Sequence, residues 1–269
     1  MHKYIGQISK LSSLLSETVK YELPIGLEKI KLNQFIGYEI NIKFKGDIFC
    51  VACNKKIKKT FMQGFCYPCF INSPNTSDCI LRPHLCKAQD GISRDMEWSK
   101  KHCLKNHYVY LSLTSNLKVG VTRGSQIPTR WIDQGAHYAI KFAKTPNRFL
   151  AGCIEIELSK YISDRTQWRK MLQGNFEKMN LLNRKNELSK KLSLKLKKYI
   201  SNNNSIIKIE YPNLKKLSKI KSINLEKNPN ISGKITGIKG QYIIINNEFV
   251  LNVRKYTGYV LEISLSKLS

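Results

Sequence analysis

The sequence predicts an α+β fold in which a cysteine-rich segment precedes an α/β core and a β-rich C-terminal segment. Three patterns in the 269 residues lead to this prediction. Four cysteines are spaced as two Cys-x-x-Cys pairs within residues 50–69. Two short apolar runs, at 108–113 and 117–121, have the composition of strands and are followed by segments with helical spacing. After residue 230, glycines separate further apolar runs, as is typical of strands joined by turns.

Residues 1–47 are expected to form an N-terminal β-rich segment. Apolar and polar residues alternate over 37–44, which predicts a strand with one buried face. A second plausible strand, at Ile48 and Phe49, leads into the first cysteine pair. With 42% hydrophobic residues, the chain can bury two or three small cores.

Residues 48–105 are expected to form a zinc-binding region. Cys50 and Cys53 form one pair, and Cys66 and Cys69 form another after a spacer of twelve residues. Two such pairs can present four thiolates tetrahedrally to one zinc ion, which is the pattern of a zinc ribbon. A redox role for each pair is the alternative. The duplication favours a metal, because one dithiol suffices for redox chemistry.

Four lysines lie in the spacer between the two cysteine pairs, at Lys55, Lys56, Lys58 and Lys59. A spacer of this length predicts a hairpin with the lysines near its tip. Such a tip is either simply solvated or a finger that contacts phosphate groups. Both interpretations stay open at this point.

A second group of possible metal ligands follows, and it predicts a second zinc site formed by Cys79, Cys86, Cys103 and His107. The spacings of six and sixteen residues between these cysteines fit no single regular zinc pattern. The alternative is that the thiols are small buried groups that pack like apolar residues. Cys153 lies alone in an apolar run and is expected to belong to a core.

Residues 106–175 are expected to form an α/β domain with a small antiparallel sheet. The strands predicted at 108–113 and 117–121 are joined by a polar turn, and Pro128 suits the first turn of a helix. A third apolar segment lies at 139–142, and helices are expected at 151–162 and 168–172.

Residues 176–205 are expected to form a basic helix and a linker, and residues 206–269 a small β-barrel or meander. In the helix, a leucine or isoleucine recurs at every fourth position from Leu188 to Ile200, with lysines elsewhere. This pattern fits a helix packed on a neighbouring domain, a helix that contacts a nucleic-acid backbone or, less well, a helix on a membrane surface.

The charge of the chain points to a polyanionic partner. Lys and Arg number 46 against 19 acidic residues, a formal net charge of +27. Phosphate contacts release counterions from DNA or RNA, so such a charge favours nucleic acid. The alternative is a compositional drift towards Lys, Ile and Asn. No apolar run of about 18 residues predicts a membrane span, and the first residues lack the apolar core of a signal peptide. With cysteines at metal spacing, this predicts a cytoplasmic protein.

Three stretches resemble a bacterial family known as domain of unknown function 2797. The resemblance covers most of the chain and implies no established function. The residues that carry it are Gln63–Phe70, Leu117–Arg123 and Pro128–Ala136.

The region from about 106 to 175 also resembles the GIY-YIG nuclease core. The resemblance lies in Tyr108-Val109-Tyr110, in Lys118-Val119-Gly120, in Arg130 and in Glu155. It implies that Tyr110, or Tyr108, takes part in proton transfer to activate water, and that Arg130 stabilises the charge on the phosphoryl group. It also implies that Glu155 holds a divalent metal such as Mg²⁺ or Mn²⁺.

Two departures from the GIY-YIG pattern weigh against catalysis. Lys118 stands where these nucleases usually carry a tyrosine, and the spacing from Gly120 to Arg130 is slightly long. Lys118 and Arg123 are still expected to contact phosphate. The sequence therefore leaves two hypotheses: an endonuclease acting on DNA or RNA, and a non-catalytic RNA-binding protein associated with the ribosome or with tRNA, in which zinc is structural. A redox-responsive zinc protein is a third, weaker option.

Overall fold

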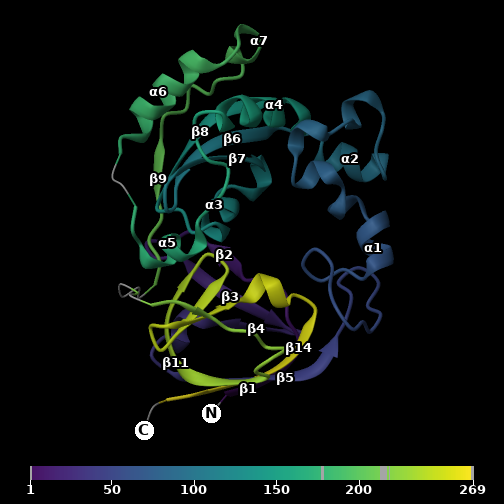
Figure 1. The fold of residues 1–269 in the computed structure, drawn as a ribbon, viewed down its shortest axis with the longest axis vertical. Helices are drawn as coiled ribbons and strands as arrows, with labels where there is room; N and C mark the ends of the chain where they lie inside the picture. Colours follow the sequence, from purple (N-terminus) through teal and green to yellow (C-terminus); the bar gives the residue numbers. More distant parts are fainter. Residues whose placement is uncertain (1, 177–178, 213–216, 218, 268–269) are drawn as a thin grey trace. The chain divides into compact units, whose positions relative to one another are not determined.

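The computed structural model describes residues 2–176, 179–212, 217 and 219–267 (Figure 1). By its internal contacts the chain divides into two compact units. The first unit combines residues 1–71 with 210–269, and the second comprises residues 72–209. Residues 177–178, which belong to the predicted basic helix, lie outside the described residues.

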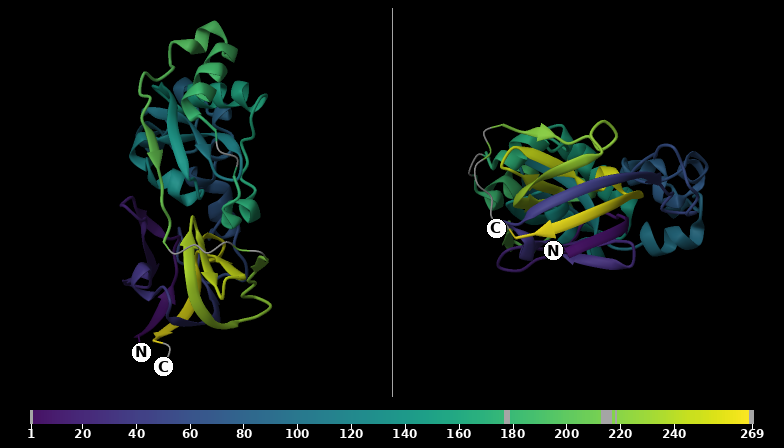
Figure 2. Two further views of the ribbon diagram at one scale, coloured as in Figure 1. Left: turned by 90° about the vertical axis from the view of Figure 1, so that its left-hand side faces the viewer. Right: turned by 90° about the horizontal axis from the view of Figure 1, so that it is seen from below.

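The first unit is built on a seven-stranded sheet that joins both ends of the chain. Its strands, in spatial order, are β1 (His2–Gln7), β14 (Tyr259–Ser266), β5 (Glu39–Ile48), β11 (Asn230–Lys239), β12 (Tyr242–Ile245), β13 (Phe249–Asn252) and β10 (Lys221–Ser222). Neighbouring strands are antiparallel except for β10 and β13. The right-hand view of Figure 2 shows β14 between β1 and β5. A three-stranded sheet adds β2 (Ser12–Leu14), β3 (Lys20–Ile25) and β4 (Glu28–Lys31).

The C-terminal strands do not form a small domain of their own, which corrects the prediction of a separate barrel or meander. Strand β14 pairs with β1 and β5, and β11 pairs with β5. Strand β9 (Ile206–Lys208) belongs instead to the sheet of the second unit. Alternation of apolar and polar residues identifies a strand, but it does not say which distant strand is its neighbour.

Buried polar side chains tie distant segments of the first unit together. The side-chain amide of Gln241 accepts a hydrogen bond from the Leu11 backbone at 2.8 Å and donates one to the Leu11 carbonyl at 3.0 Å. The Tyr256 hydroxyl accepts from the Leu225 backbone and donates to the Ile223 carbonyl, both at 3.1 Å. These bonds give partners to backbone groups that lie outside the strands.

The second unit contains a four-stranded antiparallel sheet with helices on both faces. Its strands, in spatial order, are β7 (Leu117–Arg123), β6 (His107–Leu113), β8 (Tyr138–Thr145) and β9. The strands predicted at 108–113 and 117–121 are thereby confirmed. The helices after β7 are α3 (Thr129–Asp133), α4 (Arg148–Ser159), α5 (Trp168–Gln173), α6 (Leu181–Lys191) and α7 (Leu194–Lys197).

The two faces of this sheet differ in character. Val109, Leu111 and Val119 point to one face, where they join the apolar core made by α4 and α6. Because side chains alternate along a strand, Tyr110 and Lys118 point to the other face, which also meets Trp131 of α3. The second face therefore carries the polar residues.

The expected basic helix is interrupted. Helix α6 ends at Lys191, Leu192 has an extended backbone, and α7 begins at Leu194. Leu188, Leu192 and Leu196 nevertheless all enter the core of the second unit, so their regular spacing reflects packing within the protein. Within the described residues, no helix has both the length and the apolar character needed to cross a lipid bilayer.

Candidate metal centres and a buried polar cluster

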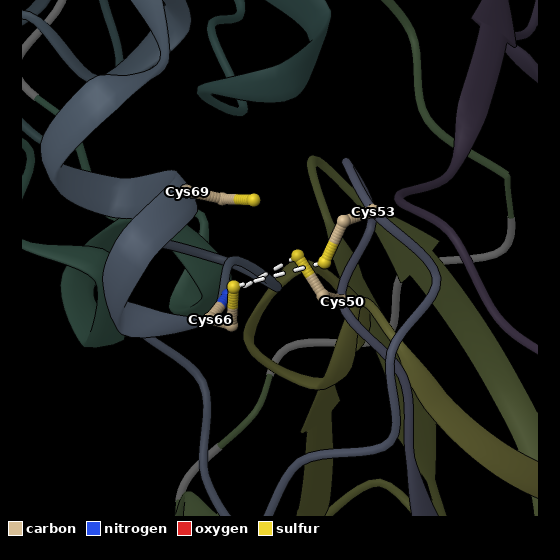
Figure 3. Close-up of side chains that lie close together, drawn as sticks. All are labelled: Cys50, Cys53, Cys66 and Cys69. Carbon is tan, nitrogen blue, oxygen red and sulfur yellow. Dashed lines mark hydrogen bonds between the residues drawn. The ribbon is translucent and has the colours of Figure 1, made fainter.

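The four cysteines of the predicted zinc ribbon converge at one point (Figure 3). Cys50 and Cys53 lie in the turn after β5, Cys66 directly precedes α1 (Tyr67–Asn72), and Cys69 lies within α1. All four sulfur atoms lie within 4.8 Å of one another, and those of Cys53 and Cys66 are 3.8 Å apart. Tetrahedral zinc with Zn–S bonds of about 2.3 Å places its sulfur ligands about 3.8 Å apart. The donor set therefore fits a metal ion such as zinc.

Backbone N–H groups point at the sulfur of Cys50, as a thiolate ligand requires. The Cys66 N–H donates to it at 3.2 Å and the Ala52 N–H at 3.5 Å. Burial opposes ionisation of this thiol, but the backbone hydrogen bonds from Cys66, Cys53 and Ala52 outweigh it and lower the pKa of Cys50 to about 6. Because the thiolate is the form that binds metal, the turn is prepared for a cation.

A second cluster of sulfur atoms lies in the second unit. Cys79, Cys86 and Cys103 also have sulfur atoms within 4.8 Å of one another, and the last two are buried. The hydrogen bonds between these thiols shift their pKa values in opposite directions. The thiols of Cys79 and Cys86 donate to Cys103 and lower its pKa, whereas the hydrogen bond to Cys103 raises the pKa of Cys79. Three thiolates so close together also form a group that could hold a metal ion.

The start of helix α4 holds the segments that carry these cysteines. The Arg148 backbone N–H donates to the Cys103 carbonyl at 2.9 Å, and its guanidinium donates to the Cys79 carbonyl at 3.2 Å. Gly152 lets the turn before Cys86 approach the helix, because a Cβ atom at this position would lie 2.1 Å from the His84 nitrogen. The buried guanidinium of Arg148 also brings positive charge to the thiols, which favours their ionised form.

His107, the expected fourth ligand, is not part of the group formed by the three sulfur atoms within the described residues. Its Nδ1 lies 2.8 Å from the Lys105 carbonyl. Its Nε2 is buried and has no hydrogen-bond partner among the described residues. Burial lowers the pKa of this imidazole to about 4, so Nε2 is an unprotonated acceptor at neutral pH.

The residues of the GIY-YIG resemblance lie near one another in the second unit. Tyr110 points to the polar face of the sheet beside Arg130 of α3, and Glu155 approaches from α4 at the edge strand β7. The Tyr110 hydroxyl donates to the Gln134 side-chain oxygen at 2.7 Å and accepts a hydrogen bond from Arg130. The phenol is completely buried, and its ring contacts Trp131 at a centroid distance of 6.0 Å. Burial raises the pKa of Tyr110 to about 12, so the phenol stays protonated at neutral pH.

Glu155 and Lys118 complete this cluster. Burial, with the nearby Asp164 as the next cause, raises the pKa of Glu155 to about 7, while Lys118 and Arg130 act in the opposite direction. Burial likewise lowers the pKa of Lys118 to about 8, helped by Arg130 and opposed by Glu155. We refer to Tyr110, Lys118, Arg130 and Glu155 as the polar cluster. It combines two cations, a carboxylate and a phenol in a partly dehydrated place, which is how proteins shift the pKa values of functional groups.

The other predicted residues lie elsewhere. The Tyr108 ring lies beneath the Lys141 ammonium at 5.1 Å, and the charged groups that act on Arg123 are Arg148 and Cys103. Lys118 is only 4% exposed, which leaves little of it for a nucleic acid at the surface. The four lysines Lys55, Lys56, Lys58 and Lys59 are exposed on the segment between the cysteine pairs, as the spacer predicts.

The sequence did not single out three residues that matter to these sites. Gln134 follows Arg130 by four positions, and this helical spacing was a usable signal for its approach to Tyr110. The charge of Asp164, in the segment after α4, acts on Glu155, and Arg148 at the start of α4 donates to the Cys79 carbonyl. Nothing local in the sequence indicates either interaction.

Comparison with known proteins gives one match. The model of a family described as "Protein of unknown function (DUF2797)" matches residues 37–261. The chain belongs to this family. The DUF2797 match spans the first cysteine group, the second cysteine group and the polar cluster. Neither the curated proteins nor the solved structures contain a match to this DUF2797 chain.

Proposed function

We propose that this protein is a zinc-containing nucleic-acid-binding protein whose polar cluster cleaves phosphodiester bonds with the help of a divalent metal ion. The observation that carries the proposal is the meeting of Tyr110, Arg130 and Glu155, which come from a strand and two helices separated in the sequence. Phosphodiester cleavage needs a cation for the phosphoryl oxygens and a group that holds the metal, and this cluster offers both.

In this proposal each residue has one task. Arg130 binds the phosphoryl oxygens. Glu155, with Asp164 nearby, supplies the carboxylate oxygens that Mg²⁺ and Mn²⁺ prefer, and the bound ion stabilises the charge that develops on the phosphate. Tyr110 orients Arg130 through its hydroxyl and does not act as the base, because its pKa is raised and its ring is buried.

The net charge supports nucleic acid as the substrate. A chain with a formal charge of +27 attracts polyanions over a long range. Lys118 adds a second cation to Arg130 inside the polar cluster. An acidic substrate is therefore favoured both at a distance and at the site.

A second candidate function is binding without cleavage, with zinc in a structural role. Burial of Tyr110 and Lys118 favours this alternative, because a phenol that is 0% exposed and an ammonium that is 4% exposed offer little surface to a substrate. The two candidates share the partner and differ in whether a bond is broken.

A cleavage assay separates them. The purified zinc-loaded protein is incubated with labelled single-stranded and duplex DNA and RNA, with and without Mg²⁺ or Mn²⁺. We expect metal-stimulated cleavage that falls at least 100-fold in Glu155→Ala and Arg130→Ala. Glu157→Ala is the matched control: it lies on the same helix, but its carboxylate binds the Ser193 backbone and hydroxyl at 2.9 Å.

The outcomes point in different directions. Cleavage that is equal in the wild type and in Glu155→Ala indicates a contaminating nuclease and overturns the catalytic proposal. Binding without cleavage in any metal supports the second candidate. The absence of any salt-dependent binding to DNA or RNA overturns both candidates.

A further inference from the structure

Three aromatic rings lie together beside the first cysteine group. The Phe61 ring lies 5.2 Å from the Tyr67 ring and 5.9 Å from the Phe70 ring, measured between centroids. Tyr67 and Phe70 lie in α1 on either side of Cys69, and Phe61 lies in the segment before Cys66. We call Phe61, Tyr67 and Phe70 the aromatic patch.

The aromatic patch is accessible to a partner. Tyr67 is 56% exposed although its ring packs against that of Phe61. Phe61 and Phe70 are partly exposed. The exposed part of the Tyr67 ring is therefore available for another flat group to stack on it.

Positive charge lies beside the aromatic patch, on the same segment of chain as Phe61. The Lys59 ammonium lies 5.3 Å from the centre of the Phe61 ring. Lys56 is paired with Asp47 at 2.6 Å, but Lys55, Lys58 and Lys59 are exposed and have no carboxylate partner in the part of the chain that the structure describes. The sequence from residue 48 to residue 77 contains no acidic residue. The surroundings therefore favour an anionic ligand.

The backbone under the aromatic patch is fixed. Phe61 and Phe65 pair across a tight loop in which Met62, Gln63 and Gly64 all have positive φ. The Gln63 side chain accepts a hydrogen bond from Arg254 at 2.5 Å, and a Cβ atom at Gly64 would lie 2.6 Å from Val51. Tyr67 lies directly after Cys66, one of the four candidate metal ligands. A rigid ring loses little entropy when a ligand stacks on it.

We propose that the aromatic patch is a stacking site for an unpaired base of a single-stranded nucleic acid, with Lys55, Lys58 and Lys59 at the adjoining phosphates. A nucleotide joins a flat π face to a negative charge, which matches exposed rings with unpaired lysines. An acidic peptide would match only the charge. This inference rests on the nucleic-acid binding proposed above, but not on cleavage, and it adds a preference for unpaired bases at a site remote in sequence from the polar cluster.

The test uses the full zinc-loaded chain and short oligonucleotides that contain 2-aminopurine, whose fluorescence falls when it stacks. Single-stranded DNA and single-stranded RNA form separate arms, each compared with its duplex. We expect quenching on binding, and an affinity for the single strand that falls about 10-fold or more in Tyr67→Ala. Tyr67→Phe should bind like the wild type, because stacking needs the ring and not the hydroxyl.

Tyr161→Ala is the matched control. Tyr161 is 51% exposed and also has a lysine above its ring, with the Lys191 ammonium at 5.8 Å, but no second ring contacts it in the described residues. Its substitution should leave the affinity unchanged. Zinc content and thermal melting are measured for each variant, so that loss of the fold is not mistaken for loss of stacking.

The results distinguish this inference from the proposed function. Normal affinity and quenching in Tyr67→Ala, with binding intact in the wild type, overturns the inference and leaves nucleic-acid binding standing. Equal losses for single strands and duplexes also overturn it, because a duplex has no base free to stack. A wild type that binds no oligonucleotide overturns the proposed function and the inference together.

Discussion

The hydroxyl oxygen of Tyr110 occupies the place where a side chain on Gly120 would begin. The two residues are directly opposite each other in strands β6 and β7, and a Cβ atom on Gly120 would lie 2.5 Å from that oxygen and 2.6 Å from the carbon that carries it. Gly120 therefore lets the phenol lie flat across the neighbouring strand and reach Gln134 and Arg130. Gly120, the last residue of the second motif, is therefore needed to make room for Tyr110 of the first motif.

Substitution of Gly120 by alanine should consequently displace Tyr110. Because the phenol is fully buried and cannot swing into solvent, we expect Gly120→Ala to lower the free energy of unfolding by about 2–4 kcal/mol. Urea denaturation followed by tryptophan fluorescence measures the change, since Trp131 contacts the Tyr110 ring. In the double variant Gly120→Ala/Tyr110→Leu the two costs should not add, because the shorter side chain leaves room for the methyl group. Additive costs would contradict the proposed contact.

The buried carboxylate of Glu155 should lower the free energy of unfolding when it is ionised. Its pKa is raised from 4.5 to about 7, so between these pH values the folded state holds a proton that the unfolded state has lost. The free energy of unfolding therefore falls as the pH rises through this window, and the full cost remains above pH 7. We expect Glu155→Gln to stabilise the protein by about 1–3 kcal/mol at pH 8 and to have little effect below pH 4.5.

The comparison is made by urea denaturation at pH 4 and pH 8 in buffer without Mg²⁺ or Mn²⁺. Glu157→Gln serves as the control. It should not stabilise the protein at pH 8, because its carboxylate accepts hydrogen bonds from the Ser193 backbone and hydroxyl. A Glu155→Gln protein that is less stable than the wild type at pH 8 would show that the charged carboxylate is well paired in the fold.

The sequence predicted the features whose signal lies within a few neighbouring residues, and it did not predict contacts between distant segments. The cysteine pairs Cys50/Cys53 and Cys66/Cys69 predicted one cluster, and the strands β6 and β7 were confirmed, because spacing and alternation act over a few residues. The partners of β14 were not predicted, because β1 and β5 lie more than 200 residues earlier in the chain. The GIY-YIG resemblance named residues that the structure brings together, and their catalytic role stays a prediction.

The break in the expected basic helix coincides with a contact to a residue of α4 that is distant in the sequence. Glu157 of α4 binds the Ser193 backbone N–H and hydroxyl, which gives these groups a partner outside the helix. Ser193 stands at the N-cap position of α7, directly after the extended Leu192 that follows α6. The leucines keep their spacing across the break and still enter one core, so periodicity alone could not locate the interruption.

Lys239 should make the first unit more stable as the pH rises above neutrality. It is 0% exposed, lies 5.2 Å from the centre of the Tyr211 ring, and burial lowers its pKa from 10.5 to about 7. Between these pH values the unfolded state holds a proton that the folded state lacks. The free energy of unfolding therefore rises with pH, by up to about 1.4 kcal/mol per unit for one proton.

Lys239→Met should remove this slope and stabilise the protein most at pH 7 and below, where the cost of the buried ammonium is largest. Urea denaturation of the wild type and the variant from pH 6.5 to pH 9.5 measures the difference. Lys234 lies at an exposed position of the same strand. Lys234→Met should therefore leave the pH dependence of the free energy of unfolding unchanged. Parallel pH profiles for the wild type and Lys239→Met would mean that Lys239 is charged in the fold.

The metal content of the purified protein should be two equivalents of zinc, one for each group of cysteines. Cys53→Ser removes one of four converging sulfur atoms and Cys79→Ser one of three, so each variant should lose about one equivalent, measured by inductively coupled plasma mass spectrometry. Cys153→Ser is the control, because this thiol lies on α4 outside both groups and packs against the apolar core. Because a structural zinc contributes directly to folding, Cys53→Ser should also melt at a lower temperature than Cys153→Ser. One equivalent in the wild type, kept in Cys79→Ser, would mean that the group of three thiols packs without a metal. A metal-free wild type with all eight cysteines reduced would contradict both centres.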